Sequence, residues 1–241
     1  MVGAVLFDGD QTLWDFQRVM RQALTATLAE LRVARPGPVA EALREVDLNA
    51  DRNAVARELE GVEFNLARLR QLGFARTLER FADADGWSAP ENMELAHTLS
   101  VSYFAYRDRD PALFDDAVPC LDALVGRTRL GLLSNGSRLP ETVGLGRYFD
   151  VVVFAQDHRV AKPDRGIFEV AERQLGLSPA DCVLVGDHPL NDVVGAKRAG
   201  WRAVWLDRVT GGDYCGPHGC AEQPDAVITS LGDLPALVTT W

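Results

Sequence analysis

The sequence has no long hydrophobic run, fewer basic than acidic residues, and only four cysteines. No stretch approaches the roughly 18 consecutive apolar residues of a membrane-spanning helix. No basic segment followed by a long apolar stretch opens the chain, so a secretion signal is not expected. Neither a membrane partner nor export is therefore predicted, and the expected location is cytoplasmic.

Basic residues are too few for a broad cationic surface. Lys and Arg number 25 against 35 Asp and Glu, which gives a formal net charge of -10. Binding to a nucleic acid backbone normally requires such a surface, so we expect no polynucleotide partner. A phosphate group that binds this protein must be held by a few local groups.

Four cysteines are too few for a disulfide framework in a chain of 241 residues. Cys120 and Cys182 lie in apolar runs and are expected to pack as small hydrophobic side chains. Cys215, His218 and Cys220 are three potential soft-metal ligands within six positions, but zinc would need a fourth ligand. The sequence favours a surface loop rich in Gly and Pro for this segment.

The chain has enough apolar material for a folded core. Hydrophobic residues make up 47% and charged residues 25%, which is typical of one or two globular domains. Residues 15–111 show helical periodicity, with predicted helices over 16–31, 39–46, 62–72, 75–82 and 93–106. We therefore predict an all-helical domain over 15–111.

The remaining residues alternate between short apolar strands and helices. Strands are predicted at 2–7, 130–133, 151–154, 183–185 and 203–206, with a weak edge strand at 227–228. Helices are predicted near 119–124, 167–175 and 190–199. This alternation predicts a parallel α/β sheet covered by helices on both faces, formed by residues 1–14 and 112–241.

Polar residues follow the apolar runs at four places. These residues are Asp8 and Asp10, Ser134, Lys162, and Asp187 with Asp192. Ligands of open parallel sheets bind at the carboxyl ends of the strands, so these side chains are expected to meet. Asp8 and Asp10 would converge if strand geometry persisted, with a repulsion on the order of 4 kcal/mol that calls for a cation or a raised carboxyl pKa.

The ordered set resembles the four motifs of the haloacid dehalogenase-like hydrolase superfamily. The segments that carry the resemblance are Asp8-Gly9-Asp10-Gln11-Thr12, Ser134-Asn135-Gly136, Lys162-Pro163, and Gly186-Asp187 with Asp192. The resemblance implies a Rossmann-like core with a helical cap inserted between the first two motifs. Each motif alone is weak, whereas the ordered set is specific.

The resemblance also implies a role for each residue. Asp8 would attack phosphorus and form an aspartyl-phosphate, and Asp10 would protonate the leaving oxygen and later accept a proton from water. The phosphate-binding residues would be Thr12, Ser134, Asn135 and Lys162. Mg²⁺ would be held by Asp8, Asp10 through its backbone carbonyl, Asp187 and Asp192, because this ion prefers oxygen ligands.

The expected activity is therefore Mg²⁺-dependent hydrolysis of a small phosphorylated metabolite, such as a nucleotide, a sugar phosphate or phosphoglycolate. Dehalogenases of this superfamily lack the second acid, so Asp10 argues against carbon-halogen cleavage. Phosphomutases typically have Val where Thr12 stands, which favours hydrolysis modestly. A phosphomutase, and a non-catalytic phospho-accepting or binding domain, stay open as alternatives.

Overall fold

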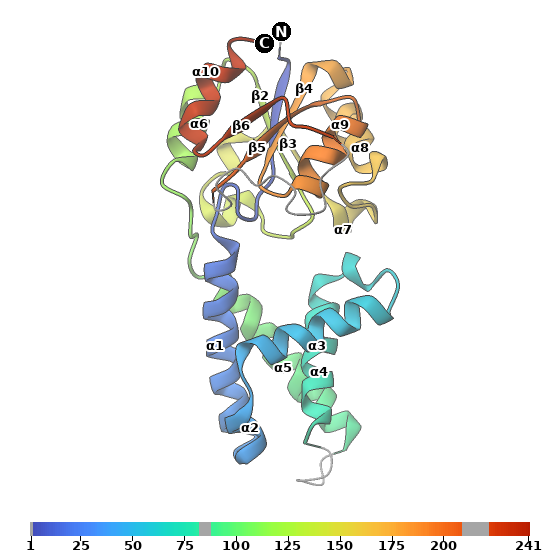
Figure 1. Cartoon of the computed structure of the whole chain (residues 1–241). Coiled ribbons are helices and arrows are strands. Elements are labelled where there is room, and N and C mark those ends of the chain that lie inside the picture. Colours follow the sequence, from blue (N-terminus) through green and yellow to red (C-terminus); the bar gives the residue numbers. More distant parts are fainter. Residues whose placement is uncertain (1, 82–87, 209–221) are drawn as a thin grey trace. The chain divides into compact units, whose positions relative to one another are not determined.

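The computed structural model describes residues 2–81, 88–208 and 222–241 (Figure 1). It divides into two compact units, Met1–Phe16 with Pro111–Trp241, and Gln17–Asp110. We refer to the first as the core unit and to the second as the helical unit. Cys215, His218 and Cys220 lie outside the described residues. Within the described residues, no helix is both long and apolar enough to cross a membrane.

The core unit is built on a six-stranded sheet in which every pair of neighbours is parallel. The strands are β1 (Ala4–Phe7), β2 (Arg129–Ser134), β3 (Val151–Phe154), β4 (Cys182–Gly186), β5 (Arg202–Leu206) and β6 (Ala226–Ile228). Their order is β3-β2-β1-β4-β5-β6, so β1 lies inside the sheet and β6 at one edge. The predicted α/β class, with a parallel sheet and a weak edge strand, is confirmed.

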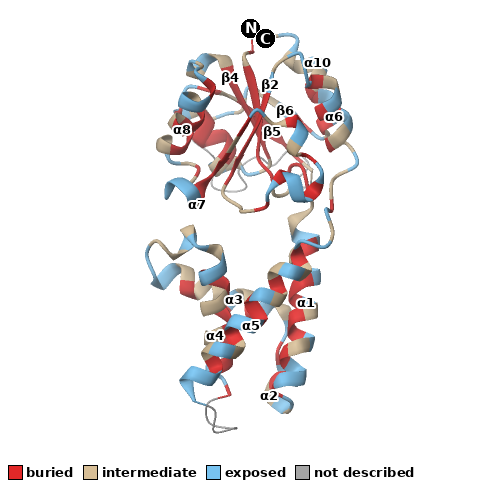
Figure 2. Cartoon of the chain, turned by 180° about the vertical axis from the view of Figure 1, so that it is seen from behind, coloured by how far each residue is buried: buried red, intermediate tan, exposed pale blue. Residues whose placement is uncertain are grey.

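Helices cover both faces of this sheet (Figure 1). They are α6 (Ala117–Leu124), α7 (Ala155–His158), α8 (Arg165–Leu175), α9 (Gly195–Arg198) and α10 (Leu234–Val238). Alternate residues of β1 join different clusters: Val5 and Phe7 pack with α6 and α10, whereas Ala4 and Leu6 pack with α8 and α9. The inner strands β1 and β4 are consequently buried throughout (Figure 2), which explains their continuous apolar runs.

Some predicted boundaries in the core unit were wrong. The helix predicted over 190–199 is a π-helical turn at Pro189–Val194 followed by the short α9. His188 begins this turn, and its ring Nδ1 accepts hydrogen bonds from the backbone N–H groups of Leu190 and Asn191. Cys120 and Cys182 are buried in the apolar clusters as predicted, and burial raises the pKa of each thiol to about 12.

The helical unit has its own apolar core. Its helices are α1 (Phe16–Ala34), α2 (Pro38–Ala42), α3 (Glu45–Glu58), α4 (Leu66–Glu79) and α5 (Ala89–Arg107), with a 3₁₀ turn at Val62–Phe64. The all-helical character of this segment is confirmed, although several boundaries differ from those predicted.

Two boundary errors have physical causes. Leu43 and Arg44 adopt extended backbone angles, so the helix predicted over 39–46 is divided between α2 and α3. No separate helix was predicted over Glu45–Glu58, the range of α3, because Asp51 occupies a buried position where an apolar residue would be expected; this carboxylate accepts hydrogen bonds from Arg80 and Thr77. A buried polar residue of this kind interrupts the apolar pattern from which a helix is predicted.

Helix α4 replaces two helices predicted over 62–72 and 75–82. Gly73 interrupts the apolar pattern, but it lies where α4 crosses α3. A Cβ atom at position 73 would be only 2.8 Å from the Cα atom of Arg52. The glycine is therefore a contact point between helices and not a helix end.

Asp116 joins three segments of the core unit. Its carboxylate accepts hydrogen bonds from both terminal nitrogens of Arg208 (3.1 and 2.8 Å), from Ser230 Oγ (2.8 Å) and from the backbone N–H of Leu231 (3.0 Å). Arg208 also donates to the carbonyl oxygen of Thr12 (3.0 Å). Partial burial alone would raise the pKa of Asp116, but these donors hold it below its usual value of 3.8.

We expect Asp116→Asn to lower the free energy of unfolding by about 2 kcal/mol at pH 7, since hydrogen bonds to a charged group are lost. The folded pKa of Asp116 lies below the unfolded one. This contribution is therefore complete above the usual pKa of 3.8 and disappears as pH falls through the lower folded value. Urea unfolding of both proteins between pH 7 and pH 3 measures the difference.

The exposed neighbour Asp115 supplies the control. Asp115→Asn should unfold as the wild type does at each pH. A gap for Asp116→Asn that stayed constant down to pH 3 would contradict the role of the ionised carboxylate.

Candidate active site

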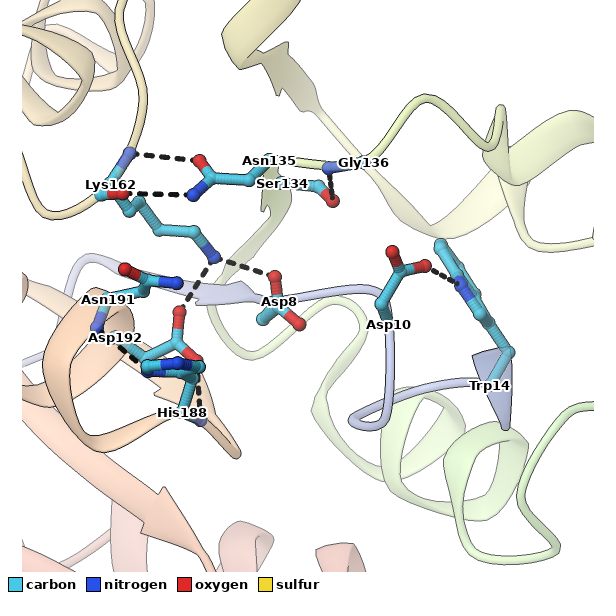
Figure 3. Close-up of polar contacts among 10 residues, drawn as sticks. All are labelled: Asp8, Asp10, Trp14, Ser134, Asn135, Gly136, Lys162, His188, Asn191 and Asp192. Carbon is cyan, nitrogen blue, oxygen red and sulfur yellow. Dashed lines mark hydrogen bonds and ion pairs between the residues drawn. The ribbon is translucent and has the colours of Figure 1, made fainter. Parts of the chain in front are cut away.

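Three of the polar residues identified in the sequence lie at the carboxyl edge of the sheet, as the predicted strand ends implied. Asp8 directly follows β1, Ser134 ends β2 and Asp187 directly follows β4. The register aligns Phe7 of β1 with Leu132 and Val185 of its neighbours, so all three strands end at a similar level. Figure 3 shows Asp8 and Ser134 with the polar side chains around them.

The ammonium group of Lys162 lies between two carboxylates. Its Nζ donates to Asp8 Oδ1 and to Asp192 Oδ1, each at 2.7 Å (Figure 3). Lys162 is 3% exposed, Asp8 7% and Asp192 2%. Charges this deep in a protein are tolerated only when they are paired and hydrogen-bonded, so the three side chains depend on one another. Burial alone would lower the pKa of Lys162, yet the two carboxylates raise it above its usual value.

Asn135 fixes the backbone of Lys162. The Asn135 side chain donates from Nδ2 to the Lys162 carbonyl oxygen and accepts at Oδ1 from the Lys162 N–H, both at 2.9 Å. The amide thus pairs with both backbone groups of one residue. Sequence reasoning gave Asn135 a phosphate-binding role and did not foresee this contact. In the structure its side chain serves to place the lysine.

Asp192 is held on its other side as well. Its Oδ2 accepts a hydrogen bond from the backbone N–H of His188 at 2.9 Å. Gly186, the last residue of β4, lies directly against the carboxylate: a Cβ atom at position 186 would be 2.3 Å from Asp192 Cγ. The absence of a side chain at Gly186 is what allows Asp192 to reach Lys162.

Three acidic side chains converge where a cation could bind. Asp8, Asp187 and Asp192 each offer an oxygen, and these oxygens lie within 4.8 Å of one another. Burial raises the pKa of Asp8 well above its usual value, Lys162 opposes this, and the acids Asp192, Asp10 and Asp187 add to it. Burial and the Asp192 charge raise the pKa of Asp187 to about 7.

This charge balance fits a divalent cation. Three buried or half-buried carboxylates share one ammonium group, so ionisation of all three leaves excess negative charge. Carboxylate oxygens are hard ligands, which suit Mg²⁺ and similar ions. The donor set is therefore consistent with the metal expected from the sequence.

The carboxylate of Asp10 does not join this group. Strand β1 ends at Phe7, and the backbone N–H groups of Thr12, Leu13 and Trp14 then turn back to the Gly9 carbonyl oxygen. Strand geometry therefore ends before residue 10, so the condition under which Asp8 and Asp10 were expected to converge is not met. Asp10 Oδ1 instead accepts a hydrogen bond of 2.7 Å from the Trp14 indole (Figure 3).

Two hydroxyl residues complete the predicted set. Ser134 is buried, and its Oγ accepts a hydrogen bond from the Gly136 N–H at 2.9 Å. Thr12 is fully buried, and its Oγ1 has no hydrogen-bond partner among the described residues. A buried hydroxyl without a partner is unfavourable, so Thr12 is a candidate for a contact with a bound ligand.

We expect Gly186→Ala to disrupt the site because the new methyl group would occupy the place of the Asp192 carboxylate. Displacing Asp192 from Lys162 should lower the free energy of unfolding by roughly 1–3 kcal/mol. It should also weaken divalent-cation binding, which isothermal titration with Mg²⁺ can measure.

Gly232→Ala is the matched control, since a Cβ at Gly232 would meet only Ser230 Oγ, at an ordinary 3.4 Å. Wild-type stability and Mg²⁺ binding in Gly186→Ala would show that Asp192 does not depend on this glycine.

Comparison with known proteins identifies the family. A family model described as haloacid dehalogenase-like hydrolase matches residues 2–200. The Escherichia coli protein named 5-amino-6-(5-phospho-D-ribitylamino)uracil phosphatase YigB is 29% identical, with 98% of this chain and 96% of that protein covered. Human N-acylneuraminate-9-phosphatase is 28% identical, with 98% and 94% covered.

Solved structures share the fold along the whole chain. A crystal structure of a 2-haloacid dehalogenase from Pseudomonas syringae pv. Tomato DC3000 has a TM-score of 0.80 and 28% identity, and both chains are covered completely. The expected motifs occur in order, their residues meet at the sheet edge, and the family model spans most of the sequence. The chain belongs to the haloacid dehalogenase-like hydrolase family.

Proposed function

We propose that this protein is a Mg²⁺-dependent phosphatase that hydrolyses a small phosphate monoester through an aspartyl-phosphate intermediate on Asp8. The arrangement of Asp8 is the main support: it is buried, contacts Lys162, and lies within reach of two further carboxylates. A nucleophile at this place can have its charge offset on one side by an ammonium group and on the other by a metal.

In the first step, a carboxylate oxygen of Asp8 forms a bond to phosphorus while the bond from phosphorus to the ester oxygen breaks. The bonding electrons pass to the ester oxygen, which takes a proton from the Asp10 carboxyl group and leaves as an alcohol. Asp10 suits this task because Lys162 pairs with Asp8 and Asp192, whereas the Asp10 carboxylate accepts a hydrogen bond from the neutral Trp14 indole.

In the second step, Asp10 accepts a proton from water, and the water oxygen attacks the phosphorus of the aspartyl-phosphate. The bond between Asp8 and phosphorus breaks, which restores the carboxylate and releases inorganic phosphate. Lys162 would stay close to the phosphoryl oxygens in both steps, a role supported by the two hydrogen bonds through which Asn135 fixes its backbone. Thr12 Oγ1 is a candidate donor to the same oxygens.

Asp8, Asp187 and Asp192 would hold the metal. When bound, Mg²⁺ would neutralise the negative charge that accumulates as Asp8 meets the phosphate group. Without such a cation, phosphate would approach a site with three carboxylates and one ammonium group. Electrostatic repulsion therefore makes activity without metal unfavourable.

Phosphate esters are favoured over halogenated acids as substrates, although the fold also matches a dehalogenase. Asp10 is the residue that distinguishes them, because carbon-halogen cleavage in this family proceeds without a second acid there. The relatives aligned over nearly the whole chain include two named as phosphatases of phosphorylated small molecules. We propose a substrate of the same chemical class.

The helical unit would select that substrate. We propose that the segment predicted as residues 15–111 acts as a cap that excludes water from the bound ester, as inserted domains of this family do. The core assigned to residues 1–14 and 112–241 would carry the chemistry.

Asp8→Asn should abolish phosphate release, by roughly 10³-fold or more in kcat, because the nucleophile is lost. A panel of nucleotides, sugar phosphates and phosphoglycolate, assayed with Mg²⁺ and with chelator, measures this. Wild-type release should require Mg²⁺ and identify the substrate class. Asp233→Asn, an exposed acid in the same unit, should retain activity.

Near-normal hydrolysis by Asp8→Asn would refute the assignment of the nucleophile. Wild-type silence on the whole panel would favour a phosphomutase or a binding role.

Halide release provides a separate test. The wild-type protein incubated with 2-chloropropionate should release no chloride above the rate seen with Asp8→Asn, because Asp10 marks a phosphoryl-transfer site. Ion chromatography can measure chloride directly. Chloride release that depends on Asp8 would instead place the protein with the dehalogenases that share its fold.

A further inference from the structure

We propose that Trp14 is a positioning residue that orients Asp10 and thereby selects Oδ2 of its carboxyl group as the oxygen that transfers the proton. The inference rests on the proposed phosphatase function. It adds a residue that lies outside the four motifs and that the sequence did not single out.

The hydrogen bond between the two side chains has only one possible polarity. The indole Nε1–H of Trp14 can donate but not accept, so Asp10 Oδ1, at 2.7 Å, must be the acceptor. In a protonated carboxyl group, the carbonyl oxygen is the better acceptor and the other oxygen carries the proton. A proton on Asp10 is therefore expected on Oδ2.

The Trp14 indole is held in one position, so it can fix the orientation of the Asp10 carboxyl group. Trp14 is completely buried, and its ring lies against Gly9, where a Cβ atom would be 2.3 Å from Cζ2. Its carbonyl oxygen accepts a hydrogen bond of 2.8 Å from the Gln11 N–H. The backbone on either side is fixed too: Leu13 and Asp15 pair with residues 112–114. The donor direction thus follows from the backbone.

The other oxygen of Asp10 lies beside the segment that follows β2. A Cβ atom at Gly136 would be only 2.8 Å from Asp10 Oδ2, and the Gly136 N–H itself donates to Ser134 Oγ. The carboxyl group therefore fits between Trp14 on one side and Gly136 on the other (Figure 3). Trp14 turns the proton-bearing oxygen toward the segment in which Ser134 lies.

The consequence for the reaction depends on the leaving group. As the bond from phosphorus to the ester oxygen breaks, the proton moves from Asp10 Oδ2 to that oxygen. Weakly acidic alcohols need this proton most, whereas p-nitrophenolate leaves readily without it. Loss of the Trp14 hydrogen bond should thus slow the cleavage of some esters more than others.

The test compares Trp14→Phe with the wild type on phenyl phosphate and p-nitrophenyl phosphate, which are similar in shape. The value of kcat/KM reports the steps up to departure of the leaving group. For phenyl phosphate we expect a decrease of about tenfold, which is part of the roughly 10²–10⁴-fold that a general acid contributes, and for p-nitrophenyl phosphate one below about twofold.

Trp201→Phe is the matched control. Trp201 is also buried, and its indole donates to Glu172 at 2.8 Å, but it precedes β5 at the opposite end of the strands. Its replacement should lower both kcat/KM values by the same small factor. Equal losses on the two esters in Trp14→Phe, or no loss at all, would overturn the role of Trp14.

A second variant guards against a folding defect in Trp14→Phe. Replacement of Trp14 by 3-benzothienylalanine exchanges the N–H for sulfur and keeps the ring size. It should show the same selective loss on phenyl phosphate, whereas wild-type selectivity in this variant would contradict the proposal.

A spectroscopic test needs neither metal nor turnover. The ¹⁵N–¹H signal of the Trp14 indole, identified by its disappearance in Trp14→Phe, should shift in Asp10→Ala and keep its position in Asp157→Ala. An unchanged signal in Asp10→Ala would refute the contact. The two hypotheses also fail differently: no Asp8-dependent turnover of any ester defeats the proposed function, whereas non-selective loss in Trp14→Phe defeats only this inference.

Discussion

The site depends on one buried ammonium group. Lys162 holds together two carboxylates that are 154 and 30 positions away in sequence. Without it, Asp8 and Asp192 would be negative charges removed from water and close to each other, which is unfavourable by several kcal/mol. The same pairing brings three segments together, namely the end of β1, the loop before α8 and the turn after β4.

Neutral groups make this ion pairing possible. Asn135 supplies no charge, yet it fixes both backbone groups of Lys162, so the lysine side chain starts from a defined place. Gly186 contributes by having no side chain, which leaves room for Asp192. A displaced Asn135 amide would misplace Lys162, and a methyl group at position 186 would misplace Asp192. The motifs thus include residues that act only through their neighbours.

Sequence patterns predicted the parts of the site that follow from strand direction. Parallel strands end at one edge, so Asp8, Ser134 and Asp187 had to be neighbours once the strands were recognised. The direction of Asp10 could not be predicted, because it depends on the turn back to Gly9 and on the left-handed conformation of Gln11, φ 63°. Helix α3 was hidden for a related reason: the Asp51 to Arg80 pair replaces the apolar contacts that periodicity detects.

Two aspartates of one short loop thereby receive different partners. Asp8 faces an ammonium group, which opposes the rise in pKa caused by burial and so supports the ionised form that a nucleophile needs. One partner of Asp10 is a neutral indole donor, which fixes an oxygen and itself carries no full positive charge. A lysine beside Asp10 would favour its carboxylate so strongly that proton donation would become difficult. The division of labour proposed for these residues therefore follows from their neighbours, since the residue type is the same.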